Sequence, residues 1–233
     1  MSKNKLIAMI PARLGSKRIP KKNIRLFAGK PLIQYPIDLA LSMGVFDEIW
    51  VNTEDKLLGK LAESLGAKFH KRPESLAADH ATNRDFTYEF LKNHVADYIV
   101  MINTTSPLLT TKTGLEFVKY LTENNYDTLL STLEERAETF YMDKPLNFTF
   151  DEKINSQMLE PTEKVVWALT AWKREVFIKL NDMGINPVFG GVVGKYAIPK
   201  DESCDLDTEE DWRLAEGIMI SRNISNKKEY ITL

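Results

Sequence analysis

Hydrophobic runs and amphipathic stretches alternate along the first 132 residues of this chain. Short apolar runs predict buried strands at Leu6–Ile10, Ile49–Asn52, Tyr98–Asn103 and Thr128–Thr132. Between these runs, apolar residues at helical spacing predict helices at Leu32–Met43, Lys56–Leu65, Arg84–Asn93 and Lys112–Asn124. Because strands that alternate with helices form βαβ units, we expect an α/β fold with a mostly parallel sheet flanked by helices.

The alternation breaks at residues 134–164, which are rich in acidic, aromatic and proline residues. This segment contains Phe140-Tyr141 and Phe148-Thr149-Phe150. From the residues alone, it is a surface excursion with its own small apolar cluster. No internal repeat or linker divides the rest, so we expect residues 1–233 to form a single domain.

Composition and charge narrow the class of protein. With 233 residues, the chain is long enough to bury one full core. The 31 basic residues balance 33 acidic ones to a net charge of −2, which argues against general affinity for nucleic acid. Cys204 is the single cysteine, so no internal disulfide forms, in agreement with a reducing cytoplasm. The apolar runs are too short for a membrane span or a signal peptide, so we expect a cytoplasmic protein with no membrane partner.

A basic loop follows the first predicted strand. Five cations fall within ten residues, at Arg13, Lys17, Arg18, Lys21 and Lys22. A strand that leads into a basic loop is typical of phosphate binding at the carboxyl edge of an α/β sheet. The single glycine of the loop excludes both the P-loop and the dinucleotide fingerprint. The alternative is a solvated surface loop without a ligand.

Two aspartates near the end of the chain form a second candidate site. Asp205 and Asp207 are two positions apart, so in extended chain their side chains point the same way. Such a pair can share Mg²⁺ with substrate phosphates. The alternative is helix capping, with Asp207 or Thr208 as the N-cap and Glu210 or Asp211 completing a capping box.

The basic loop also carries a family resemblance. It reads Pro11-Ala12-Arg13-x-Gly15-Ser16-Lys17-x-Ile19-Pro20-x-Lys22-Asn23, which resembles the opening motif of the sugar-acid cytidylyltransferases. These enzymes make CMP-activated acylneuraminic and related nonulosonic acids. Four further matches follow in family order, at residues 29–33, 72–79, 105–108 and 205–211, so that the resemblance spans about residues 5–220.

The resemblance implies a reaction and a set of site residues. CTP and a nonulosonic-type 2-keto sugar acid would give the CMP-sugar and pyrophosphate, with Mg²⁺ or Mn²⁺ held by Asp205 and Asp207. The catalytic residues would be Arg13, Lys22 and Asp207, and Asn23 would read cytosine, since an amide offers both a donor and an acceptor. The nucleotide contacts would be Ala12, Arg13, Leu14, Gly15, Ser16, Lys22, Asn23, Arg72 and Thr82, with Asn83 as the alternative to Thr82. The sugar contacts would be Asn103, Ser106 and Trp172. A dimerisation insertion at about residues 134–172 would make the protein a homodimer.

Several positions depart from the family pattern and leave the acceptor open. Leu14 and Arg18 stand where the family commonly has glycine, Asn103-Thr104 replaces Gln-Pro, and Leu169-Thr170-Ala171-Trp172 replaces Asn-Gly-x-x-Tyr. The last two changes lie where the family meets the sugar. The acceptor is therefore a nonulosonic acid, a keto-deoxy-octulosonate or a phosphorylated compound, and the remaining alternative is a catalytically silent nucleotide-binding protein.

Overall fold

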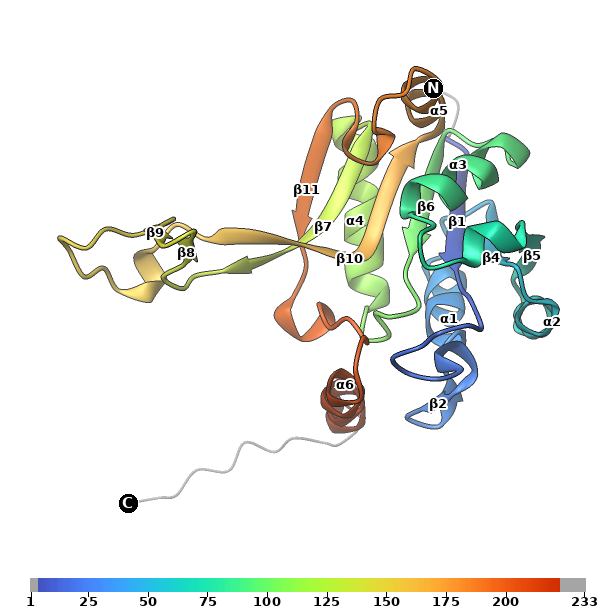
Figure 1. Ribbon diagram of the computed structural model, residues 1–233, viewed down its shortest axis with the longest axis horizontal. Helices are drawn as coiled ribbons and strands as arrows, with labels where there is room; N and C mark the ends of the chain where they lie inside the picture. The colour runs from blue at the N-terminus through green and yellow to red at the C-terminus, as the bar shows by residue number, and fades with distance from the viewer. Residues whose placement is uncertain (1–3, 223–233) are drawn as a thin grey trace.

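A central sheet organises the part of the chain that the computed structural model describes, residues 4–222 (Figure 1). Its strands are β1 (Leu6–Pro11), β4 (Glu48–Thr53), β5 (Lys68–Lys71), β6 (Tyr98–Ile102), β7 (Thr128–Glu135), β10 (Thr162–Lys173) and β11 (Val193–Ala197). Within residues 4–222 they form a seven-stranded sheet in the order β11-β7-β10-β6-β1-β4-β5. Neighbouring strands are parallel except where β10 runs antiparallel to β6 and β7. The predicted mostly parallel sheet is confirmed.

Helices cover both faces of this sheet. They are α1 (Gln34–Met43), α2 (Lys56–Ser64), α3 (Asn83–Asn93), α4 (Thr111–Asn124), α5 (Arg174–Asp182) and α6 (Glu209–Arg222). The four helices and four strands expected before residue 133 all occur. Their ends lie within two residues of the prediction, except that β7 continues to Glu135. None of the helices within residues 4–222 has the length and apolar character needed to span a bilayer.

Alternating residues of β1 supply both halves of the core. Met9 lies in a buried cluster with Phe90 of α3 and Phe177 of α5. Ala8 lies in the cluster on the opposite face, with Leu58 of α2 and Phe117 of α4. Because both faces of β1 are buried, its sequence is continuously apolar rather than alternating. Because β1 is parallel to both β4 and β6, the carboxyl ends of these strands lie at the same edge of the sheet, where open α/β folds bind ligands.

A third apolar cluster attaches the C-terminal helix to the loop after β1. Leu206, just before α6, and Trp212, in its first turn, pack with Ile19 and Phe27 from the N-terminal loop. The rings of Phe27 and Trp212 meet edge to face, with their centroids 5.4 Å apart. This cluster fixes the Asp205–Asp207 segment beside the basic loop, although more than 180 residues separate them.

A long arm projects from the sheet where β7 and β10 continue beyond it (Figure 1). Residues 134 and 135 still pair with Glu163 and Thr162. The tip carries the short strands β8 (Phe140–Tyr141) and β9 (Lys144–Pro145) and the 3₁₀ turn η3 (Ser156–Met158). Phe140, Phe148 and Phe150 form an aromatic cluster there, with centroids 5.0–6.1 Å apart.

The predicted insertion at residues 134–172 is too long at its C-terminal end. Residues 169–173 of β10 pair with β6 inside the central sheet. The ladder between β7 and β10 is interrupted between Val165 and Thr170. The buried Ser131 hydroxyl fills this irregularity and accepts a hydrogen bond from the Leu169 amide at 3.0 Å. The arm therefore ends near Val165, and the chain after it belongs to the core.

Candidate functional site

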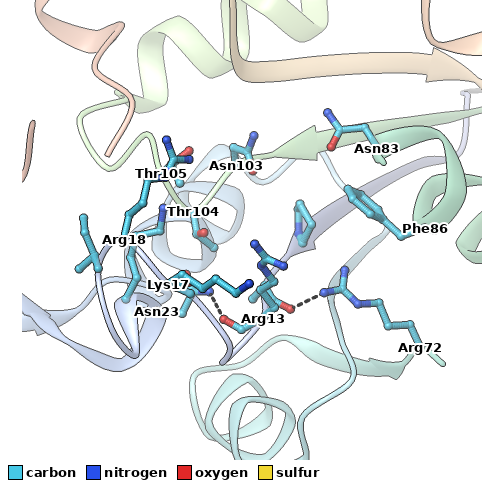
Figure 2. Close-up of a pocket in the computed structure, with 15 residues that line it drawn as sticks. Arg13, Lys17, Arg18, Asn23, Arg72, Asn83, Phe86, Asn103, Thr104 and Thr105 are labelled. Atoms are coloured by element: carbon cyan, nitrogen blue, oxygen red, sulfur yellow. Dashed lines mark hydrogen bonds between the residues drawn. The ribbon is translucent and has the colours of Figure 1, made fainter. Parts of the chain in front are cut away.

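A cavity of about 200 Å³ opens where β1 and β6 end (Figure 2). Its walls come from the basic loop, the end of β5, the first turn of α3 and the turn after β6. The residues discussed below that line it are Ala12, Arg13, Ser16, Lys17, Arg18, Lys22, Asn23, Arg72, Asn83, Phe86, Asn103, Thr104 and Thr105. The cavity thus gathers cations and amides from segments far apart in the sequence.

Two cations of the basic loop are held by one carboxylate. Arg13 Nη1 lies 3.0 Å from Asp79 Oδ1 and also donates to the Ala77 carbonyl at 3.0 Å. Lys17 Nζ forms an ion pair with the other oxygen of Asp79. Hydrogen bonds from Lys17 and Arg13 hold the pKa of Asp79 below its usual range. The loop at residues 77–79 therefore orders two of the cations that line the cavity.

Asn23 is almost fully buried at the base of the loop, with 3% of its surface exposed. Its Nδ2 donates to the Arg13 carbonyl at 2.8 Å, which fixes the orientation of the amide (Figure 2). Among the described residues, Oδ1 has no hydrogen-bond partner. A buried acceptor without a partner costs about 1–3 kcal/mol, so this oxygen is a strong candidate for contact with a ligand donor.

Arg72 is buried in the cavity wall and spans the ends of two strands. Its Nη2 donates to the Ala12 carbonyl and to Glu54 Oε2, each at 3.0 Å. The guanidinium lies 5.4 Å from the centre of the Phe86 ring. Burial lowers the pKa of Arg72, while Glu54 opposes this effect by stabilising the charged form.

The basic loop touches the aspartate pair directly. Lys22 Nζ donates to the Leu206 carbonyl at 2.7 Å, and Arg18 Nη2 lies 2.7 Å from Asp207 Oδ1. Burial lowers the pKa of Lys22, although Asp207 and Asp205 act against this shift. The pKa of Asp205 is raised, chiefly by desolvation and further by the like charge of Asp207. The carboxylates of Asp205 and Asp207 thus lie close together, next to the cations Arg18 and Lys22.

Helix capping is carried out by the residues after the pair. Thr208 Oγ1 accepts from the Asp211 amide at 3.2 Å, and Asp211 Oδ2 accepts from the Thr208 amide at 2.7 Å. This is a capping box at the start of α6. Thr208 is therefore the N-cap, and the side chain of Asp207 is not engaged in capping.

The donor set at Asp205 and Asp207 suits a hard divalent cation. Within residues 4–222, no group of three or more His, Cys, Asp or Glu side chains is arranged to hold a metal ion. Mg²⁺ commonly takes one or two carboxylates and completes its shell with water and substrate phosphates. The pair fits Mg²⁺ as part of a complex with a polyphosphate, because the adjacent loop supplies the cations that bind one.

Three of the predicted nucleotide contacts do not line this cavity. Leu14 packs partly against the core, and Gly15 has open space where a Cβ would stand. Thr82 is instead the N-cap of α3, in a capping box with Asp85. Its neighbour Asn83 lines the cavity, as do Lys17, Arg18 and Phe86, which the sequence did not mark as contacts.

Of the three predicted sugar contacts, Asn103 lines the cavity and Ser106 and Trp172 do not. Asn103 lines it and donates from Nδ2 to the Trp167 carbonyl at 2.9 Å. Ser106 is buried behind Thr104 and Thr105, which line the cavity in its place. Trp172 is wrong as a sugar contact, because it is fully buried in the core and pairs with Ile99 toward the opposite end of β6. The indole nitrogen of Trp172 donates to the Val188 carbonyl at 3.1 Å.

Several known proteins resemble this chain in sequence. The model of a protein family described as cytidylyltransferase matches residues 7–165. The chain is 31% identical over 214 residues to N-acylneuraminate cytidylyltransferase A of Danio rerio, covering 90% of this chain but 49% of that protein. It is 31% identical over 232 residues to the pseudaminic acid cytidylyltransferase of Campylobacter jejuni, covering 91% of this chain and 95% of that one. The chain thus spans about half the length of the first relative and nearly all of the second.

The fold also resembles a solved structure. CMP:2-keto-3-deoxy-manno-octonic acid synthetase complexed with CTP aligns with a TM-score of 0.68 and 19% identity, covering 94% of this chain and 99% of that one. At this identity the likeness shows a shared fold alone.

Proposed function

This chain belongs to the cytidylyltransferase family, and on that basis we propose that it transfers the cytidylyl group of CTP to a nonulosonic-type 2-keto sugar acid. The products are the CMP-sugar and pyrophosphate. One observation carries the proposal: Lys22 reaches the Leu206 carbonyl at 2.7 Å, which joins the basic loop to the Asp205–Asp207 segment. A polyphosphate-binding loop and a carboxylate pair are the two parts that this reaction needs in one place.

The proposed chemistry is a direct displacement at phosphorus. The anomeric hydroxyl oxygen of the acid donates an electron pair to the α-phosphorus of CTP and forms the new P–O bond. The bond from the α-phosphorus to the bridging oxygen breaks, and that oxygen leaves with its electron pair on pyrophosphate. The hydroxyl proton passes to solvent. Arg13 and Lys22 stabilise the negative charge that grows on the departing pyrophosphate.

Asp205 and Asp207 would hold Mg²⁺, or Mn²⁺, together with phosphate oxygens of CTP. When bound, the cation supplies Lewis-acid chemistry that lowers the pKa of the attacking hydroxyl. Arg18 neutralises Asp207 in the ligand-free chain through their 2.7 Å ion pair. Binding of the nucleotide complex would release Arg18 toward the phosphates.

Asn23 is proposed to recognise cytosine. Its Nδ2 is committed to the Arg13 carbonyl, so the buried Oδ1 is the atom left to accept from a ligand. Cytosine presents an amino group as donor where uracil presents a carbonyl oxygen. Asn83, Arg72 and Ser16 are proposed to complete the nucleotide site, since each lines the same cavity.

The arm at residues 134–165 is proposed to join two copies into a homodimer. Its tip exposes large apolar side chains, including Tyr141 at 64%, Met142 at 78% and Phe150 at 76%. A cluster of this kind is typical of an interaction surface. Sedimentation would show a dimer that Phe150→Ser weakens, and a monomer at all concentrations would contradict this part of the proposal.

The proposed activity also implies a location and a use. An enzyme that consumes CTP is expected in the cytoplasm, which agrees with the unpaired Cys204. Its product would be an activated donor for the synthesis of a polysaccharide or another glycan.

Pyrophosphate release tests the proposal. The chain is mixed with CTP, Mg²⁺ and one acceptor at a time, using nonulosonic acids, a keto-deoxy-octulosonate and a phosphorylated polyol. Release that requires a nonulosonic acid supports the proposal, and release with only another acceptor replaces its substrate class. Nucleotide binding without release in any mixture would leave a silent binding protein.

A further inference from the structure

A largely buried ion pair lies beside the proposed CTP cavity, at the ends of β4 and β5. Glu54 Oε2 lies 3.0 Å from Arg72 Nη2, and the two side chains are 14% and 3% exposed. Glu54 directly follows β4, and Arg72 directly follows β5. Arg72 lines the cavity, whereas Glu54 does not. The carboxylate of Glu54 can therefore act on a nucleotide only through the groups that it holds.

The Glu54 carboxylate holds two parts of the proposed nucleotide site. Oε2 accepts from the Arg72 guanidinium, and Oε1 accepts from the Leu14 amide of the basic loop at 3.4 Å. The same Nη2 of Arg72 also donates to the Ala12 carbonyl at 3.0 Å (Figure 2). One carboxylate thus connects the ends of β4 and β5 to the start of the basic loop.

The Arg72 guanidinium keeps a further donor for a ligand. Its Nε is buried and has no hydrogen-bond partner among the described residues. Because Glu54 and the Ala12 carbonyl both engage Nη2, the orientation of the planar guanidinium is fixed, and the position of Nε is fixed with it. A buried donor without a partner is costly, so this atom suits an acceptor atom of a ligand in the cavity.

The position of this donor depends on the charge of Glu54. Removal of one member of a buried ion pair leaves the charge of the other member uncompensated. Without the carboxylate, the Arg72 guanidinium would turn toward water, and Nε would leave the place that it now holds.

We infer that Glu54 is a positioning residue of the nucleotide site, which sets the orientation of Arg72 for CTP without touching the nucleotide. The inference rests on the proposed function, which supplies the identity of the nucleotide. Arg72 would hold CTP equally in the ground state and in the transition state. A change at Glu54 should therefore raise the KM for CTP and leave kcat nearly constant.

Glu54→Gln tests this inference, because the variant keeps the shape of the side chain and removes its charge. Binding of CTP is measured by calorimetry without an acceptor, and kcat and KM are measured by pyrophosphate release. The Kd and the KM for CTP should each rise about threefold to tenfold, because a charge-assisted hydrogen bond is roughly twice as strong as a neutral one. The kcat should stay within about twofold of the wild-type value.

Glu48→Gln is the matched control, because Glu48 is a carboxylate at the opposite end of the same strand. Its side chain is 21% exposed, it forms ion pairs with Lys5 and Lys68, and it does not line the cavity. Both variants lose an ion pair of β4 or its end, so both can lower Tm. Only Glu54→Gln should weaken the binding of CTP.

A double-mutant cycle with Arg72→Ala shows whether Glu54 acts through Arg72. Arg72→Ala should raise the Kd for CTP, and the addition of Glu54→Gln should raise it no further. The inference alone would be overturned by a folded Glu54→Gln chain with the wild-type Kd, by an equal loss in Glu48→Gln, or by effects of the two site variants that multiply. Binding of CTP without pyrophosphate release from any acid would overturn the proposed function alone, because the Kd values still test Glu54. A wild-type chain that does not bind CTP would overturn both.

Discussion

Replacement of Asn23 by alanine should remove much of the preference for CTP over UTP. In the folded chain, Asn23 Oδ1 is buried without a partner among the described residues, and Nδ2 is fixed on the Arg13 carbonyl at 2.8 Å. The amino group of cytosine would satisfy this acceptor. The carbonyl of uracil would place a second acceptor against it.

The size of the effect follows from one buried polar atom. Leaving such an atom unsatisfied costs about 1–3 kcal/mol, so the wild-type chain should prefer CTP by about tenfold to a hundredfold in kcat/KM. Asn23→Ala removes the acceptor, so the preference should fall to within about threefold. The rate with both nucleotides should also fall, since the freed Arg13 carbonyl no longer anchors the loop.

The assay is pyrophosphate release with each nucleotide at a saturating concentration of acid. Asn103→Ala is the matched control, because Asn103 lines the same cavity and also uses Nδ2 to hold a main-chain carbonyl. It should lower activity with both nucleotides and preserve their ratio. Equal wild-type rates with CTP and UTP, or a ratio that Asn23→Ala leaves intact, would refute the assignment.

Three further predictions concern the metal pair, the basic loop and the pair of His70 and His94, whose ring nitrogens lie 2.9 Å apart. Asp207→Asn should abolish most activity, because it removes a proposed metal ligand. It should change Tm little, because Thr208 rather than Asp207 caps α6. A fully active variant, or activity that survives EDTA, would contradict the metal role. Replacement of Arg13 or Lys22 by alanine should lower kcat more than it raises the KM for CTP, because negative charge on pyrophosphate grows as the bond breaks. Near-normal rates of both variants in steady-state assays would show that the basic loop is a solvated surface with no catalytic role. Burial and the neighbouring His70 lower the pKa of His94 to about 4, below its unfolded value of about 6.5. The unfolded chain then binds more protons between these values, so stability that is present at pH 7 should be lost progressively as the pH falls from 6.5 to 4. Urea unfolding of His94→Gln should show a flatter pH dependence, and identical profiles would contradict the assignment.

Much of the fold was predictable because each buried strand of the first half is a short apolar run bounded by polar residues. The run at residues 6–10 is apolar throughout, since both faces of β1 are covered by helices. The second half was harder to predict. The register of β10 depends on its irregular pairing around Ser131, and no local pattern of residues announces that shift. The insertion was therefore extended too far, and Trp172 was assigned to the site rather than to the core.

The residues of the candidate site were likewise predictable only in part. Arg13, Lys22 and Asn23 were found because they form a dense local motif directly after a strand. Thr82 was assigned in place of Asn83 because one sequence cannot distinguish an N-cap from the residue that follows it.

The central claim is that this chain forms a bond between the α-phosphorus of CTP and a nonulosonic-type acid. Phosphorus NMR of a mixture of the chain, CTP, Mg²⁺ and the acid tests it most directly. The account predicts a new phosphodiester signal that grows in equal amount with pyrophosphate and requires the acid. Appearance of CMP or CDP with phosphate and no phosphodiester, or unchanged CTP with every acid offered, would contradict the account.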